Sequence, residues 1–173
     1  MIIQADTRQK KKHHTVKEKY FESQGIKVIS SKALVGDYII PAKGDISVDT
    51  KANISELYGN LIQQHDRFHN ECVLAMDAGI KLYILVENKD GVKCVEDLKK
   101  WKNPQMFRYY KAKQQALAKG LKEPKPPASN IQLIKIMHSM TRDYGVEFVF
   151  CTPNEAGQRV IDLLTGGKGL EQK

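Results

Sequence analysis

The chain has 173 residues, of which 41% are hydrophobic and 28% charged, a composition that suits one globular domain and excludes an intrinsically disordered chain. No apolar run approaches the roughly 20 residues needed to cross a bilayer, which excludes a membrane-spanning helix. Three widely spaced cysteines lack the spacing of a metal site and suit a reducing compartment, so we expect a cytoplasmic protein, with a formal net charge of +8.

Strand and helix patterns alternate along the chain. Predicted strands are apolar or β-branched runs, and predicted helices carry apolar residues at helical spacing. In chain order we predict a strand over 2–5, a helix over 16–23, strands over 26–30, 35–40 and 46–51, helices over 53–64 and 67–78, a strand over 81–87, helices over 103–120 and 131–144, a strand over 146–151 and a helix over 155–164. This alternation predicts an α/β domain with a mixed central sheet flanked by helices.

The positive charge is concentrated in one quarter of the chain. Residues 1–87 hold 12 Lys/Arg against 11 Asp/Glu, residues 88–130 hold 11 against 4, and residues 131–173 hold 5 against 5. A local excess of this kind is expected of a surface that neutralises phosphates. The alternative is a solvated basic helix that only keeps the protein in solution.

We therefore interpret residues 88–130 as a basic helical insertion. The core of the single domain would then comprise 1–87 and 131–165, followed by a flexible tail over 166–173. Four aromatic residues occur in the insertion: Trp101, Phe107, Tyr109 and Tyr110. They lie among six cations that we expect to contact DNA: Lys99, Lys100, Lys102, Arg108, Lys111 and Lys113. Such aromatics can stack on unpaired bases, or they can pin the insertion to the core, which is the favoured interpretation for any single ring.

A candidate catalytic pattern is an acid on one strand followed by acid-x-Lys on the next. Residues two apart on a strand share a face, so the acid and the lysine point together. Acid-x-Lys begins at Asp49, Glu87, Asp97, Glu123 and Glu171. The last three fall in a predicted helix, a proline-rich connector and the tail. Glu87 ends a predicted strand and is a rival, but only Asp49 has an acid on the strand just before it.

That acid is Asp37. If the turn is centred on Lys43, antiparallel pairing matches positions that sum to 86, which places Asp37 opposite Asp49 with Cβ atoms about 5 Å apart. Two carboxylates suit Mg²⁺ or Mn²⁺, and Lys51 would stabilise charge on a phosphate. The alternative is that Asp37 belongs to a turn and that Asp49 and Lys51 form a surface pair.

These residues resemble a known signature. Gly36-Asp37, followed by Asp49-Thr50-Lys51, is similar to the Gly-Asp … Glu-Arg-Lys motif of the XPF-type structure-specific endonucleases, within the PD-(D/E)xK restriction-endonuclease-like superfamily. Further similarity lies in Asp6-Thr7-Arg8, in Asp66-Arg67-Phe68, and in Phe148-Val149-Phe150 with the helix after it. No helix-hairpin-helix pattern follows residue 165, so the resemblance is to a stand-alone nuclease domain.

The resemblance implies a Mg²⁺-dependent DNA endonuclease, structure-specific in repair or recombination, that forms a homodimer. Asp37 and Asp49 would be metal ligands, Lys51 the catalytic lysine and Asp6 an acidic helper, while Arg8 and Arg67 would contact DNA.

Three residues depart from the signature. Asp49 stands in place of Glu, Thr50 in place of Arg, and Ser55 in place of a further acid. Two alternatives therefore stay open. One is a catalytically silent DNA-binding partner subunit, and the other is a Holliday-junction resolvase or restriction-like nuclease.

Overall fold

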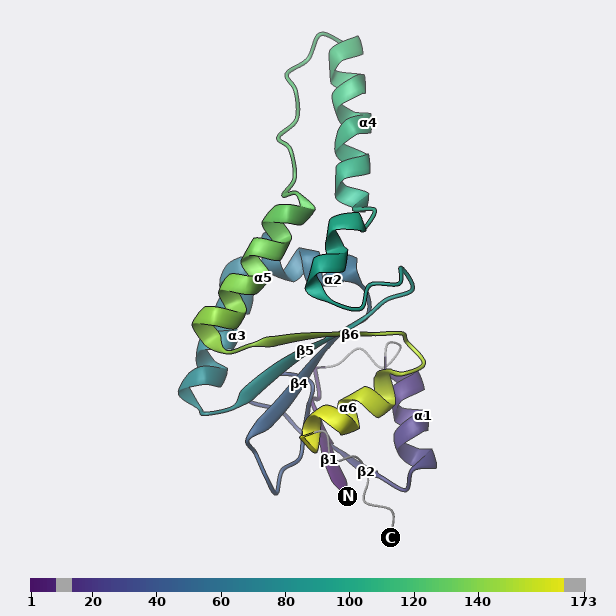
Figure 1. Ribbon diagram of the computed structural model, residues 1–173, viewed down its shortest axis with the longest axis vertical. Coiled ribbons are helices and arrows are strands. Elements are labelled where there is room, and N and C mark those ends of the chain that lie inside the picture. The colour runs from purple at the N-terminus through teal and green to yellow at the C-terminus, as the bar shows by residue number, and fades with distance from the viewer. Residues whose placement is uncertain (9–13, 167–173) are drawn as a thin grey trace.

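A six-stranded mixed sheet forms the centre of the protein, in a computed structural model that describes residues 1–8 and 14–166 (Figure 1). The strands are β1 (Ile2–Ala5), β2 (Lys27–Ser30), β3 (Tyr38–Ile39), β4 (Ile46–Lys51), β5 (Lys81–Glu87) and β6 (Glu147–Cys151). Their order is β2-β1-β3-β4-β5-β6, and only the pairs that involve β3 are antiparallel. The predicted α/β class with a mixed sheet is confirmed.

Helices cover both faces of this sheet. One face carries α1 (Thr15–Ser23) and α6 (Ala156–Leu164), and the other carries α2 (Ile54–Tyr58), α3 (His65–Asp77) and α5 (Asn130–Tyr144) (Figure 1). Each face therefore packs into its own apolar cluster, and the central strand β5 is buried from both sides. This explains the nearly continuous apolar run of β5, because successive side chains point to opposite faces of the sheet and each face packs against an apolar cluster.

Two predicted elements differ from the structure. The strand predicted over 35–40 is wrong at its start, because Gly36 has φ +67°, outside the extended region, and only Tyr38–Ile39 pairs. The helix predicted over 53–64 is divided into α2 and a π-helical turn, Gly59–Gln63, closed by a bond from Gln64 N–H to the Gly59 carbonyl (3.0 Å).

The basic segment 88–130 divides into two parts. Its first part contains the 3₁₀ helix Val95–Lys100 and packs into the core, where Leu98 and Trp101 are buried. The second part projects from the domain as α4 (Pro104–Ala118) and an extended return segment (Figure 1). We call residues 104–127 the arm. None of the residues of α4 is buried.

The described part of the chain has no helix that is both long enough and apolar enough to span a membrane. Residues 167–173, most of the predicted flexible tail, lie outside the described residues.

The backbone at Gly36 provides a test of the hairpin. In Gly36→Ala the new Cβ would overlap Ser47 Oγ and approach the Val48 carbonyl carbon to 3.3 Å, in addition to the strain of positive φ. We expect the free energy of unfolding, measured with urea, to fall by about 2–4 kcal/mol. Gly44→Ala is the matched control, because Gly44 has φ +71° but no atom within 4 Å of the added Cβ. It should cost only about 1–2 kcal/mol, and equal losses in the two variants would contradict the steric argument.

Candidate active site

The β3–β4 hairpin has the predicted register. Tyr38 pairs with Val48 and Ile39 with Ser47, so paired positions sum to 86. Asp37 lies one residue before β3, and its N–H donates to the Val48 carbonyl (2.9 Å), one position out of the register of β3 with β4. The backbone of Asp37 is therefore held opposite the end of β4 that carries Asp49.

Thr50 holds the Asp37 carboxylate. Asp37 Oδ2 accepts one hydrogen bond from the Thr50 N–H (2.9 Å) and another from the Thr50 hydroxyl. Bonds of this kind orient a carboxylate and favour its charged form. Thr50, a departure from the Gly-Asp … Glu-Arg-Lys signature, thus has a definite local role as an anchor for Asp37.

Asp49 and Lys51 share one face of β4, as the two-residue period predicts. Lys51 Nζ lies 2.6 Å from Asp49 Oδ2, and both side chains are more than nine-tenths buried. Asp49 Oδ2 is inaccessible to solvent, so the Lys51 ammonium is the close positive charge that balances it. Phe68 of α3 covers the lysine, with its ring centroid 5.9 Å from Nζ.

A third carboxylate, Glu71 of α3, belongs to the same cluster and was missed in the sequence. Its Oε1 accepts a hydrogen bond from the Gly36 N–H (3.0 Å), next to Asp37. The sequence does contain a signal that Glu71 points towards the sheet. Phe68, Cys72 and Ala75 are the buried face of α3, and Glu71 falls within that helical spacing, so it points towards the sheet.

Burial changes the ionisation of the whole cluster. Burial, together with the charge of Asp37, raises the pKa of Asp49 to about 6, although the Lys51 ammonium opposes the shift. Burial also raises the pKa values of Asp37 and Glu71. The pKa of Lys51 is raised as well, because the neighbouring Asp49 carboxylate outweighs the effect of burial. Three acids beside one ammonium leave excess negative charge, which a bound cation would neutralise.

The donor set fits a hard divalent cation. Mg²⁺ prefers oxygen ligands and commonly takes only one or two carboxylates, completed by waters and substrate phosphate oxygens. Among residues 1–8 and 14–166, no group of three His, Cys, Asp or Glu side chains is placed to hold a metal ion by itself. Asp37 and Asp49 would be the carboxylate ligands of such a cation.

Asp6 has a different environment from Asp37 and Asp49. Arg8 Nε lies 3.0 Å from both carboxylate oxygens of Asp6, and the Arg8 guanidinium also donates to the Ala33 carbonyl (3.2 Å). Burial would raise the pKa of Asp6, but the hydrogen bonds from Arg8 outweigh it and the pKa is lowered. Asp6 thus forms an ion pair that positions Arg8, and the predicted role of acidic helper stays a prediction.

Two arginines lie within electrostatic reach of the acidic cluster. Arg8 has a side chain that is 59% exposed, and the charges of Glu71 and Asp37 contribute to its raised pKa after its bonds to Asp6. Arg67 is exposed on α3 and partly offsets the raised pKa of Glu71. Both arginines therefore bring positive charge to the border of the acidic cluster.

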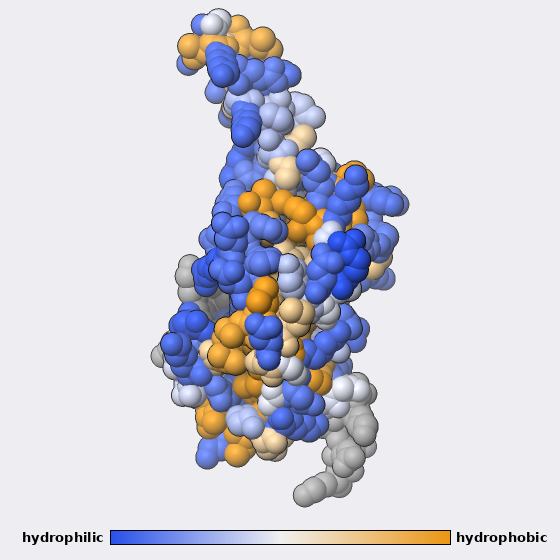
Figure 2. Space-filling view, turned by 90° about the vertical axis from the view of Figure 1, so that its left-hand side faces the viewer, coloured by the Kyte–Doolittle hydropathy of each residue, from blue (hydrophilic) through white to orange (hydrophobic). Residues whose placement is uncertain are grey.

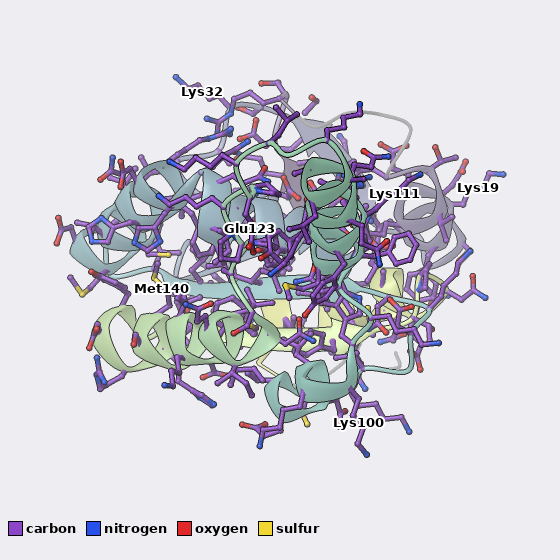
Figure 3. All side chains as sticks on the ribbon, turned by 90° about the horizontal axis from the view of Figure 1, so that it is seen from above. Lys19, Lys32, Lys100, Lys111, Glu123 and Met140 are labelled. Carbon is purple, nitrogen blue, oxygen red and sulfur yellow. The ribbon has the colours of Figure 1, made fainter. Side chains whose placement is uncertain are left out.

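The cations of the basic segment do not form one patch. Lys100 points outward from the 3₁₀ helix and away from α4, whereas Lys111 projects from α4 itself (Figure 3). Lys99, Lys102 and Arg108 are also exposed. Lys113 is paired with Glu123 of the return segment (2.6 Å).

The rival motif that begins at Glu87 is a structural ion pair. Glu87 is buried and pairs with Lys17 of α1, while Lys89 is exposed in the loop after β5. Glu87 also points to the opposite face of the sheet from Asp49, because Asp49 is in register with Ile84 and side chains alternate along β5. The structure therefore favours Asp49 over Glu87 as the acid of the site.

The fold is similar to that of two solved structures. No protein-family model and no curated protein sequence matches the chain. Among solved structures it is similar to XPF from Aeropyrum pernix, with a TM-score of 0.60 and 16% identity over 97% of this chain and 62% of that chain. It is also similar to XPF from Aeropyrum pernix in a complex with DNA, with a TM-score of 0.59 and 18% identity over 99% of this chain and 68% of that chain. The chain has the XPF-type nuclease fold, as the resemblance predicted.

Replacement of Glu71 tests the carboxylate cluster. The pKa of Glu71 in the folded state lies above its ordinary value of 4.5, so ionised Glu71 lowers stability as the pH rises through the raised pKa. Glu71→Gln lacks this loss and can still accept the Gly36 N–H. We expect the stability of the variant relative to the native chain to rise with pH above about 4.5 and to level off once the pH exceeds the raised pKa of Glu71, measured by urea unfolding without divalent ions. Asp77→Asn, at the exposed end of α3, is the control. A relative stability that falls with pH would contradict the cluster.

Replacement of Lys17 tests the buried pair. Lys17→Ala leaves the Glu87 carboxylate buried without this ammonium, and we expect a loss of about 3–5 kcal/mol in the free energy of unfolding. The double variant Lys17→Met with Glu87→Gln removes both charges and should recover most of that loss. Lys19→Ala is the control, since Lys19 points into solvent from the same helix (Figure 3). Equal stability of Lys17→Ala and Lys19→Ala would argue against a structural pair.

Proposed function

We propose that the protein is a metal-dependent endonuclease that hydrolyses phosphodiester bonds in DNA. The observation that carries this proposal is the convergence of Asp37, Asp49 and Lys51 in one cluster at the end of β4, where Asp49 and Lys51 are buried and Asp37 is half-buried. The XPF-type fold supports it, because the cluster lies at the residues through which the sequence resembles that signature.

Asp37 and Asp49 would hold Mg²⁺ or Mn²⁺. When bound, the cation would polarise the phosphate and lower the pKa of a water molecule. The Lys51 ammonium would then be released from Asp49 to stabilise negative charge on the phosphate as it develops. Thr50 keeps Asp37 oriented throughout, and Glu71 adds negative charge beside the site.

DNA is the proposed substrate. A structural neighbour is a complex with DNA, and Arg8 and Arg67 border the site. We further propose that the substrate is a branched, flap or junction DNA in repair or recombination. A homodimer and a DNA-associated location in the cytoplasm stay predictions of the resemblance and the composition. A Holliday-junction resolvase or restriction-like nuclease would use the same chemistry, and the product ends on defined junctions would separate these alternatives.

A catalytically silent DNA-binding subunit is the second candidate. The observation in its favour is that Lys51 already neutralises Asp49, while Thr50 and Ser55 replace charged residues of the signature. The carboxylate cluster itself argues against a silent subunit. A subunit that only binds DNA has no need for a cluster whose mutual repulsion destabilises the fold unless a cation is bound.

Cleavage of labelled branched and linear DNA in Mg²⁺ or Mn²⁺ tests the proposal. Asp49→Ala removes a metal ligand and Lys51→Ala removes the stabilising ammonium, so each should lower the cleavage rate at least about 100-fold. Lys43→Ala, in the exposed turn of the same hairpin, should leave the rate unchanged.

Circular dichroism would establish that each variant is folded. If both active-site variants cleave like the native chain, the assignment is wrong. Binding that is steep in salt, with no cleavage in any divalent ion, would favour the silent subunit.

A further inference from the structure

The arm is held to the domain at both ends, and its two segments contact each other. At the base, Asn103 is buried and its side chain accepts the Gln105 N–H (3.0 Å) to cap α4. The Tyr58 hydroxyl donates to the Ala128 carbonyl (2.9 Å) just beyond the return segment. Along its length, Glu123 of the return segment accepts the Tyr109 hydroxyl (2.5 Å) and pairs with Lys113 (2.6 Å). Both ends of the arm are thus fixed to the domain.

α4 has two different faces. Tyr109, Lys113 and Ala116 are half-buried on the face towards the return segment. Phe107, 75% exposed, points away from that face, and Tyr110, 56% exposed, lies at its side, with its ring centroid 5.4 Å from that of Tyr109. Phe107 and Tyr110 are three residues apart in one helix, so their Cβ atoms lie about 5–6 Å apart on the same side. Large aromatic side chains left in water on a braced helix indicate a surface that is covered when a partner binds.

The charge of the arm indicates which kind of partner that is. Residues 104–127 contain six Lys/Arg and one Asp/Glu, and that acid, Glu123, is already paired with Lys113. α4 itself contains no acid. A second copy of the arm would therefore bring cations against cations, whereas a polyanion is complementary to it. Arg108 and Lys111 are exposed and lie next to the two rings in the sequence.

We propose that Phe107 and Tyr110 stack on unpaired bases while Arg108 and Lys111 hold the adjoining phosphate backbone. Aromatic faces accept any unpaired base, whereas the bases of an intact duplex are already stacked on one another. Resting on the proposed nuclease function, the inference assigns the binding of the single-stranded segment of the proposed branched substrate to these two rings of the arm. Trp101 is excluded from this role because it is buried at the base of the arm, in contact with Tyr58 (ring centroids 6.3 Å apart).

The base of the arm is close to the candidate active site. Lys51 is followed by a two-residue link and then by α2, whose last residue, Tyr58, contacts the base of the arm. At the rise per residue of extended chain and of helix, Cα atoms of Lys51 and Tyr58 are at most about 16 Å apart. A strand held by Phe107 and Tyr110 therefore lies within a few nucleotides of the site.

Equilibrium binding of fluorescent DNA, measured by anisotropy in EDTA so that no strand is cut, tests the inference. Three probes of one sequence are needed: a blunt duplex, a splayed fork and a single strand. In Phe107→Ala with Tyr110→Ala, affinity for the fork and the single strand should fall at least about tenfold, while affinity for the duplex should change less than about twofold. A 2-aminopurine in the single-stranded arm of the fork should report base stacking with the native chain and lose that signal with the variant.

Two further variants separate stacking from charge and from general apolar contact. Arg108→Gln with Lys111→Gln should weaken binding to all three probes and reduce the salt dependence by about 1–2 in the log–log slope. Leu117→Ala with Leu121→Ala removes two exposed aliphatic residues from the far end of the arm, where apolar atoms gather (Figure 2). This variant should keep the native affinity for the fork.

The inference is overturned if the aromatic double variant binds all three probes as the native chain does, or loses affinity for the three equally. It is also overturned if sedimentation shows that the native chain is a dimer and that the aromatic substitutions make it a monomer without any change in DNA affinity. The two rings would then bind a second copy of the chain. These readouts use no cleavage. If the aromatic double variant keeps the native affinity for the fork while the native chain cleaves DNA, the arm proposal alone is refuted. If the variant loses affinity for the fork and the native chain cleaves no DNA in any divalent ion, the nuclease proposal alone is refuted.

Discussion

The buried carboxylate cluster at the end of β4 is the constraint on which the rest of the site depends. Asp37, Asp49 and Glu71 bring three acids to one place, and Lys51 supplies a single ammonium within the same buried space. In that environment each charge is poorly solvated, so the fold has to hold the acids in position against their mutual repulsion. An arrangement of this kind lowers stability and is maintained where a function requires it.

The hairpin and α3 supply the holding contacts. Positive φ at Gly36 ends the extended backbone and presents its N–H to Glu71, and the next residue, Asp37, is bound by the backbone and hydroxyl of Thr50. Two residues of β3 are enough to set the register. The departures from the XPF-type signature therefore do not leave the cluster disorganised, because Thr50 contributes an anchor where the signature has a cation, and Glu71 adds an acid from a neighbouring helix.

The basic segment 88–130 has two parts with different physical roles, which its composition alone does not distinguish. Its first part, with Leu98 and Trp101, completes the core beneath α2 and α5, and Asn130 of α5 donates to the carbonyls of both residues (2.9 and 2.7 Å). Its second part leaves the core as the arm, whose aromatic and cationic side chains stay in solvent. The buried part sets the direction in which the exposed part projects, and α2 connects that base to the end of β4.

The sequence by itself determined the features that depend on local periodicity. The apolar run of β5 required a strand buried on both faces, the two-residue period placed Asp49 and Lys51 together, and the turn near Lys43 set the register of β3 with β4, although Asp37 itself bonds to Val48 one position out of that register. Tertiary structure alone decided the rest. Glu71 meets Gly36 across 35 residues and Lys17 meets Glu87 across 70, and no local pattern encodes such contacts. Trp101 and Phe107 are both aromatic residues beside cations, yet one is buried and the other is exposed. Their difference arises from the packing of segments distant in the chain, which the alternation of residue types along one segment does not specify.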